Sequence, residues 1–473
     1  MNKPLKLSTL LFAGWFALSI GVTDVSAEEE AEETDADTEE ETEEDDAEED
    51  SDEAEDEVEE DRLFDVPSEE DRLLFLPRLI PDRFTYDSGI EIEYPQDGVR
   101  GVYSTAYSAG GDRFETLVDL LDRTELNSMV IDIKDDHGNI TIDTDSEDER
   151  IQNNSQAIIS DVDGMMETLE DSEIYPIARV VVFKDRVLGE SEPQLSYTEP
   201  DGSMWENYGD VFVSAFSEEV WEYNVEVARE AAKAGFKEIQ FDYIRFPENL
   251  ASNEDRLNFD YGQYGDMDVE SSEKRFRAVT DFVEYAREEL REYGVKVSVD
   301  IFGEPVRLPD GAPTIGQDYQ RIAEHVDIIS AMPYPSHWGV GHIEGIPIPD
   351  LEPYNVMDWF SQMENDVLSE LDNPPVSRPW LQDFTASYLG SGNYMSYGVA
   401  EVEAQIQALY DNDIYEFLLW NAGNSYTEGV DYTLGRDIEI AGADEKAERE
   451  DEEVDEEDSD EETDDENEDE DEE

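Results

Sequence analysis

The chain has 473 residues, with 128 acidic and 31 basic side chains, a formal net charge of -97 at pH 7 and no cysteine. So acidic a chain is a poor partner for nucleic acid, whose phosphates need clustered Lys and Arg, and for an anionic membrane surface. The lack of cysteine excludes disulfides, thiolate metal ligands, a cysteine nucleophile and a lipid anchor on cysteine.

Residues 1–27 are predicted to be a secretory signal peptide. Lys3 and Lys6 precede an apolar run at 7–22, and Val25, Ser26 and Ala27 supply the small residues of a cleavage site. A retained membrane anchor is the alternative, but the run is shorter than the roughly 20 residues that a spanning helix needs. We therefore expect a protein that is secreted or associated with the cell wall, with no membrane insertion after signal removal.

Two further segments, residues 28–61 and 444–473, consist almost wholly of acidic and small residues. They hold too few apolar side chains to offset the entropy of ordering, so both are predicted to be disordered acidic tails. The intervening residues, 62–443, suffice for one large domain. We interpret the acidic surface as a halophilic adaptation. Binding of calcium or cell-wall cations by the tails is the alternative.

Within residues 62–443, eight short runs rich in β-branched and aromatic residues alternate with segments of helical periodicity. The runs are 101–107, 128–133, 176–183, 238–246, 296–302, 327–332, 379–384 and 416–420. Helices are expected at 114–121, 218–234, 276–290, 318–325, 356–371 and 399–410, with Ser217 as one N-cap, and none is convincing after Trp420. The alternation predicts an α/β fold, a (β/α)8 TIM barrel.

The connections support the barrel over an open doubly wound sheet, which is the alternative. Segments from helix to strand are short, whereas those from strand to helix are long, notably 184–216, 247–270 and 333–354. In such barrels the loops after the strands build the active face, and long loops in a compact domain usually carry function. We therefore expect functional residues at the carboxyl ends of the eight runs.

Carboxylates and aromatic residues recur at these ends, in apolar surroundings where an unpaired charge is costly. The candidates are Asp132, Arg179, Asp242, Asp300, Glu304, Tyr334, Trp338, Asp383 and Trp420. Opposed carboxylates are what glycoside hydrolysis needs, and aromatic rings stack on sugars. Each carboxylate also has a structural interpretation; for Asp242 it is an ion pair with Arg245.

We therefore expect a glycoside hydrolase that acts on a polysaccharide or cell-wall glycan, without a metal or other cofactor. Asp242 is the predicted nucleophile or base and Glu304 the predicted general acid. The predicted substrate-binding residues are Asp132, Arg179, Asp300, Tyr334, Trp338, Asp383 and Trp420. An acid that works at neutral pH needs a raised pKa, which apolar walls or neighbouring carboxylates supply.

The chain also resembles the bacterial family of glycosyl-hydrolase-like domains known as DUF4015. The resemblance rests on the segments GVY at 101–103, VIDIKD at 130–135, FDYIRFP at 241–247, VDIFG at 299–303 and AMPYPSHW at 331–338. It covers about residues 98–440 and implies a glycosidase-like TIM barrel with a carbohydrate substrate. By position, Asp242 and Glu304 match the nucleophile and acid of alpha-amylase-like barrels. The sequence departs from that pattern at Gln240, where those barrels carry an arginine.

Two other functions stay open. Asp135 and Asp136, with His337 and His342, would supply the ligands of a metal-dependent polysaccharide deacetylase. A non-catalytic carbohydrate-binding barrel would keep the aromatic residues and tolerate loss of the carboxylates. The sequence leaves the sugar, the linkage, the stereochemical outcome and the oligomeric state undefined.

Overall fold

The computed structural model describes residues 85–435. The predicted signal peptide, both acidic tails and the outer limits of the predicted domain lie outside the described residues. The chain divides into two units after Arg78, and every described residue belongs to the second unit, Leu79–Glu473. No helix within residues 85–435 is long and apolar enough to cross a bilayer.

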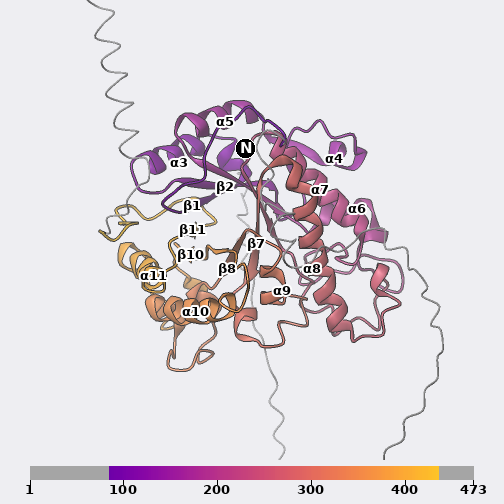
Figure 1. The fold of residues 1–473 in the computed structure, drawn as a ribbon. Coiled ribbons are helices and arrows are strands. Elements are labelled where there is room, and N and C mark those ends of the chain that lie inside the picture. The colour runs from indigo at the N-terminus through magenta and orange to yellow at the C-terminus, as the bar shows by residue number, and fades with distance from the viewer. Residues whose placement is uncertain (1–84, 436–473) are drawn as a thin grey trace, which may run out of the picture. The chain divides into compact units, whose positions relative to one another are not determined.

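A ring of parallel strands forms the centre of the domain (Figure 1). The order is β10, β11, β1, β2, β5, β6, β7, β8 and β9, and every neighbouring pair along it is parallel. The bounds are β1 (Arg100–Ser104), β2 (Ser128–Lys134), β5 (Tyr175–Val181), β6 (Glu238–Asp242), β7 (Lys296–Phe302), β8 (Ile328–Met332), β9 (Val376–Ser377), β10 (Trp380–Gln382) and β11 (Phe417–Trp420).

The two ends of this order belong to one extended segment, and this segment closes the ring. β9 pairs with β8, whereas β10 pairs with β11. Between them, Arg378 N donates to Ile329 O at 3.0 Å, and Leu418 N donates to Pro379 O at 3.0 Å. The segment therefore exchanges one neighbour for the other at Arg378 and Pro379. Counted as one strand, it completes the eight strands of a TIM barrel, so the predicted fold is confirmed.

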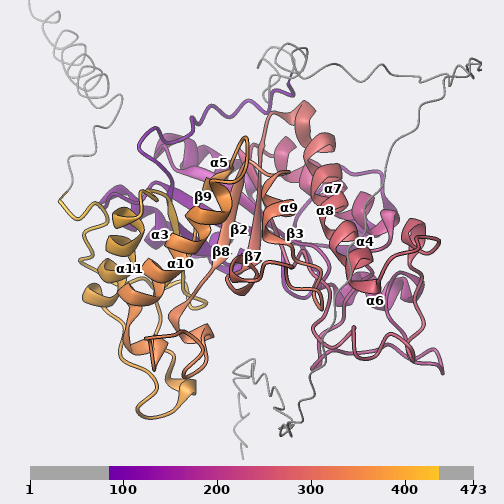
Figure 2. The ribbon, with the colours of Figure 1, turned by 60° about the horizontal axis from the view of Figure 1, so that its bottom comes forward.

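Helices cover the outside of the ring. Figure 2 shows α7 beside α8, and α10 lies beside α11 in Figure 1. The longer helices are α3 (Arg113–Asp122), α5 (Val162–Asp171), α7 (Glu218–Lys233), α8 (Ser271–Leu290), α10 (Pro353–Leu368) and α11 (Val399–Asp411), and the short helix α9 (Tyr319–Ala323) precedes β8. The predicted helices are all present, but α5 was not predicted. From Trp420 to residue 435 the described chain contains only turns and bends.

The loops after the strands carry the short elements that the sequence pattern did not indicate. These are α2 (Ala106–Ala109), β3 (Ile140–Ile142), α4 (Glu149–Asn154), β4 (Ser155–Ile159) and α6 (Arg186–Ser191). Short 3-10 turns occupy Pro193–Leu195, Gly262–Tyr264, Arg291–Tyr293, Glu304–Arg307, Pro335–His337, Pro349–Leu351 and Ser387–Leu389. The predicted run 101–107 ends early because Thr105 caps α2, its side chain accepting from Ser108 N.

Alternation along the strands separates two apolar cores. In β6, Ile239 and Phe241 join the large cluster between sheet and helices. Strand geometry then turns Gln240 and Asp242 to the barrel interior. The interior holds a smaller apolar cluster that includes Val130, Ile177, Trp380 and Leu418. Every polar residue at the inward positions must therefore find a partner inside the ring.

A buried ion-pair network closes the amino-terminal end of the barrel. Arg378 donates to Glu238 Oε1 at 2.7 Å and to Glu416 Oε2 at 2.8 Å. Tyr94, from the segment before β1, donates to Glu416 Oε1 at 2.7 Å and accepts from Arg378 Nη2 at 2.9 Å. This end is thus filled, which leaves the carboxyl ends of the strands as the open face.

Candidate active site

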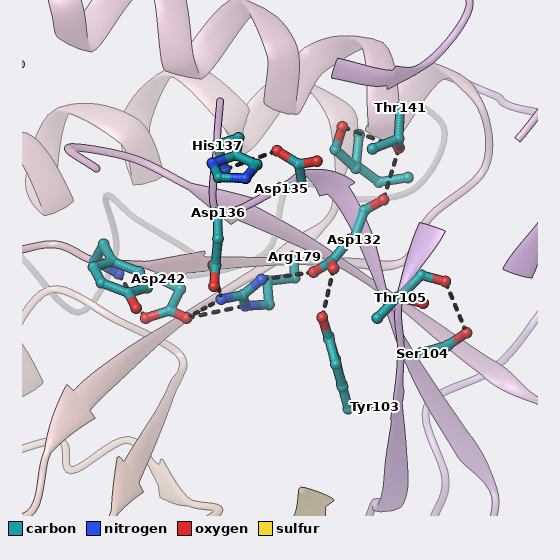
Figure 3. Close-up of polar contacts among 12 residues, drawn as sticks. Tyr103, Ser104, Thr105, Asp132, Asp135, Asp136, His137, Thr141, Arg179 and Asp242 are labelled. Atoms are coloured by element: carbon teal, nitrogen blue, oxygen red, sulfur yellow. Dashed lines mark hydrogen bonds and ion pairs between the residues drawn. The ribbon is translucent and has the colours of Figure 1, made fainter. Parts of the chain in front are cut away.

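Arg179, on β5, is the centre of the polar cluster at the carboxyl ends of the strands (Figure 3). Its Nη1 donates to Asp132 Oδ1 at 2.6 Å, and its Nη2 donates to Asp136 Oδ1 at 2.8 Å. Its Nε and Nη2 both reach Asp242 Oδ2, at 2.9 and 2.5 Å. One guanidinium thus holds three carboxylates, from β2, the loop after β2, and β6.

Asp242 ends β6 and is fixed at both oxygens. Arg179 occupies Oδ2, and the backbone N–H of Tyr243 donates to Oδ1 at 2.6 Å. Tyr243 has a φ of +53°, a left-handed conformation that is uncommon for a bulky side chain. Arg245 is not the ion-pair partner of Asp242: it pairs with Glu248 at 3.1 Å, whereas Asp242 pairs with Arg179.

The structure shows where an arginine contacts Asp242, although Gln240 stands at the position that carries an arginine in amylase-like barrels. Gln240 donates to Ser330 Oγ at 3.3 Å inside the barrel. The arginine beside Asp242 comes from the neighbouring strand as Arg179. The local chemistry of an arginine-bound aspartate is therefore present, although the sequence places the arginine elsewhere.

Asp132 shares Arg179 with Asp242 and has an aromatic partner of its own. Tyr103 Oη donates to Asp132 Oδ2 at 2.5 Å, and the Tyr103 ring stacks on Trp420 with centroids 4.2 Å apart. Burial raises the pKa of Asp132 to about 6, against the opposing effect of Arg179. Asp132 therefore titrates near neutral pH.

Asp300, on β7, faces the same interior. Trp380 Nε1 donates to Asp300 Oδ1 at 2.6 Å, and Trp380 meets Trp420 edge to face at 5.6 Å. Burial, helped by the charge of Asp242, raises the pKa of Asp300 well above its usual value. Tyr334 lies near enough for Asp300 and Asp242 to add to the effect of burial in raising its pKa. Burial thus disfavours the charged form of Asp300 beside the ion pairs that Arg179 makes.

Asp136 links the buried cluster to solvent. Its side chain is 50% exposed although it binds Arg179. Burial acts to raise the pKa of Asp136, but Arg179 and then Lys184 outweigh it and hold the pKa below the usual value. The pKa values of Asp132 and Asp136, which bind the same arginine, are therefore shifted in opposite directions, an arrangement typical of acid–base sites.

Three predicted site residues lie outside this cluster, and their roles stay predictions. The side chain of Glu304 is 49% exposed and pairs with Arg307 at 2.6 Å. Asp383 accepts from Thr427 Oγ1 at 2.5 Å and from Thr427 N at 2.9 Å, so it fastens the loop after β11. Trp338 packs edge to face on Trp359 and donates to Pro333 O at 3.2 Å. The structure brings together Asp132, Arg179, Asp242, Asp300, Tyr334 and Trp420.

The metal hypothesis gains no support from the fold. Within residues 85–435, no three His, Asp or Glu side chains are grouped so that they could hold a metal ion. Asp135 is occupied by local hydrogen bonds, accepting from Asn139 Nδ2 at 2.9 Å. His342 Nδ1 accepts from Gly339 N at 3.3 Å. The four residues of that hypothesis therefore do not form a ligand set.

Sequence reasoning did not assign Tyr103 or Asp136 to the predicted carbohydrate site, and it did not identify Trp380 as a partner of Asp300. Tyr103 lies on a predicted strand, two residues after Gly101, and alternation along the strand points its side chain inward. This alternation could have identified Tyr103 from the sequence. Asp136 follows a strand end but lies in an Asp-rich chain, where one more Asp carries little information. Trp380 is 1% exposed, and its indole N–H donates to Asp300.

A comparison with known protein families places the chain among them. Residues 101–426 match the sequence model of DUF4015, described as "Putative glycosyl hydrolase domain". No curated protein matches the chain.

Three solved structures illustrate the similarity. The chain is 35% identical to a hypothetical protein from Ruminiclostridium thermocellum, covering 42% of this chain and 96% of that one, with a TM-score of 0.36. It is 14% identical to the PgaB (BpsB) glycoside hydrolase domain from Bordetella bronchiseptica (69% and 95% covered, TM-score 0.47). It is 10% identical to the PelA glycoside hydrolase domain from Pseudomonas aeruginosa (70% and 97% covered, TM-score 0.39).

Proposed function

The chain belongs to the DUF4015 family of glycosyl hydrolase domains, and we propose that it hydrolyses glycosidic bonds in a cell-wall or extracellular polysaccharide by a two-carboxylate mechanism. The observation that carries the proposal is the ion pair between Arg179 and Asp242, which lies in a barrel end that also contains Asp300, whose pKa burial raises well above its usual value. Glycoside hydrolysis needs one carboxylate and one protonated carboxyl group.

Asp242 is the proposed nucleophile or base. Arg179 and the N–H of Tyr243 fix its orientation and stabilise its negative charge. The second lone pair of Oδ1 is then available for the anomeric carbon or for a water molecule. Tyr103, Trp420 and Tyr334 line the same interior and supply rings against which a sugar packs.

Two carboxyl groups compete for the role of general acid. Glu304, the acid predicted from the sequence, reaches solvent but pairs with Arg307. Burial raises the pKa of Asp300 well above its usual value, and Asp300 lies close enough to Asp242 for the charge of Asp242 to add to this effect. We propose Asp300 as the competitor, and substitution separates the two.

The test uses the full chain in concentrated salt, with wild type, Asp242→Asn, Asp300→Asn and Glu304→Gln. Reducing-sugar release is measured on a panel of wall and extracellular glycans, and aryl glycoside hydrolysis is measured in parallel. Loss of the nucleophile abolishes both activities. Loss of the acid abolishes polysaccharide cleavage but spares aryl glycosides, whose leaving group needs no proton. Asp281→Asn, a carboxylate bonded to Tyr264 outside the barrel, is the control.

The other functions appear as outcomes of the same test. Activity that survives Asp242→Asn would refute the mechanism. Release of acetate without release of reducing sugar, abolished by a chelator, would favour the metal-dependent deacetylase. Glycan binding without cleavage in every variant would favour a non-catalytic carbohydrate-binding barrel. We further propose that the protein acts outside the cell, after removal of residues 1–27, and in a saline medium.

A further inference from the structure

Exposed tyrosines stand on the loops that follow the strands. Tyr208 is 81% exposed in the loop after β5, Tyr107 is 74% exposed on α2 after β1, and Tyr388 is 52% exposed in the turn after β10. In a parallel barrel, all such loops lie at the carboxyl end of the strands. These three tyrosines, which we call the rim tyrosines, therefore share the face that holds Arg179 and Asp242.

The positions of two rim tyrosines are opposed. Along the closed ring, β10 and β5 are separated by β11, β1 and β2 on one side and by β6, β7 and β8 on the other. Tyr388 and Tyr208 thus follow strands that lie across the barrel from each other. A straight chain that contacts both crosses the end of the barrel, where the polar cluster lies.

Tyr208 is held at a conformational cost that packing does not explain. It forms a two-residue hairpin loop with Gly209 between Asn207 and Asp210, and both loop residues have positive φ, +54° and +93°. Such turns favour Asn, Asp or Gly at the first position, and a bulky side chain there is strained. Strain of this kind points to function where the surroundings maintain it.

The surroundings do maintain it. Asn207 donates to Glu248 Oε2 at 2.6 Å and accepts from Asn249 Nδ2 at 3.0 Å, both in the loop after β6. The hairpin tip is therefore braced by its neighbour, and the Tyr208 ring projects from a fixed base. A braced aromatic ring offers contact area at little entropic cost.

The rim tyrosines differ from the exposed tyrosines at the other end of the barrel. Tyr86 and Tyr415 each lie against another tyrosine ring, with centroids 5.6 and 5.8 Å apart. Within residues 85–435, the side chains of Tyr107 and Tyr208 make no hydrogen bond or ring contact. Two rim rings thus lack an intramolecular partner.

We propose that the rim tyrosines bind a polysaccharide chain that lies across the barrel end from Tyr388 to Tyr208, so that bonds within the chain are cut. The faces of sugar rings pack on aromatic rings, and the tyrosine hydroxyls bond to sugar hydroxyls. The net charge of -97 repels anionic polymers, so the occupant is an uncharged or amino-bearing polysaccharide. The inference takes its ligand class from the proposed function.

The test measures binding on an Asp242→Asn background, so that cleavage does not interfere. Mobility is followed in native gels that contain hydroxyethylcellulose, glycol chitosan or alginate, with Tyr208→Gly and Tyr388→Ala compared with Tyr415→Ala. These changes leave the charge unaltered, so non-specific attraction to the cationic polymer cancels. We expect each rim variant to weaken binding of an uncharged or amino-bearing polymer about tenfold, and Tyr415→Ala to leave it unchanged.

The same variants also test whether weaker binding results from misfolding. Gly suits the left-handed turn better than Tyr does, so Tyr208→Gly should keep or raise the melting temperature while it weakens binding. Unchanged binding by Tyr208→Gly, equal loss in Tyr415→Ala, preference for alginate or no binding by the parent would overturn the proposal. Rim-dependent binding without any cleavage by wild type would uphold the polysaccharide-binding role of the rim tyrosines and refute both the hydrolase and the cleavage of bonds within the chain.

Discussion

Asp132 offers a quantitative test of the electrostatics around Arg179. Its pKa is raised from 3.8 to about 6 by burial. A folded-state pKa above the unfolded value means that the folded protein binds the proton more tightly. The free energy of unfolding therefore falls as pH rises from 4 to 6. At about 1.4 kcal/mol per pKa unit, the loss above pH 6 is about 3 kcal/mol.

Asp132→Asn removes this titration. The amide cannot reproduce both acceptors offered to Arg179 and Tyr103, but that loss is independent of pH in this range. The variant should therefore gain stability relative to wild type as pH rises. Between pH 5 and 7.5, above the pI of about 4.1, the expected relative gain is about 1.4 kcal/mol, one pKa unit of the shift.

Urea denaturation at constant salt, followed by tryptophan fluorescence, measures the difference at the two pH values. Tyr103→Phe serves as a variant of opposite sign. The hydrogen bond from Tyr103 lowers the pKa of Asp132, so its removal should steepen the loss of stability with pH. A stability difference between Asp132→Asn and wild type that stays constant, or shrinks with rising pH, would refute the raised pKa.

Three further predictions concern charges. Arg179→Met leaves three carboxylates without their cation, so we expect loss of activity and a cost of about 3–5 kcal/mol, which denaturation at pH 7 measures and which acid should reduce. Lys134 and Asp185 form a buried ion pair 2.6 Å long, and replacing either residue alone with a neutral one should lower the free energy of unfolding by about 3–5 kcal/mol. The double variant, Lys134→Met with Asp185→Leu, should recover much of this loss. Equal losses in the single and double variants would contradict this prediction. Finally, transfer from molar salt to about 10 mM lengthens the Debye length to about 30 Å, so the acidic side chains repel one another over longer distances and the melting temperature should fall. A melting temperature that does not depend on salt would exclude the halophilic interpretation.

The sequence predicted the barrel well because its strands are buried on both faces. Such strands appear as continuous apolar runs, and all eight were found near their observed limits. One of the eight, the strand at Trp380, begins earlier than predicted, at Val376, because Arg378 and Pro379 interrupt the apolar pattern. The short elements in the loops after the strands owe their form to local caps and tertiary contacts rather than to periodicity.

The candidate site was predicted in part. The inward phase of a strand identifies Asp132, Arg179, Asp242 and Asp300, since each occupies a strand position that alternates with core residues. Sequence alone does not reveal that Arg179 binds Asp132, Asp136 and Asp242 together, because the contacts cross from β5 to both neighbouring strands and to the loop after β2. A position after a strand does not by itself place a side chain in the barrel end, since Glu304 follows β7 but is half-exposed and pairs with Arg307.

The pairing of β1 with β11 has a consequence for how the protein folds. Arg100 faces Phe417, so the ring joins strands from opposite ends of the described chain. Contacts of such long sequence separation form late and slowly. A chain that stops before β11 leaves two unpaired edges, on β1 and β10, which are templates for aggregation. During synthesis the barrel cannot close until its last strand emerges, so a nascent chain needs protection from association until then.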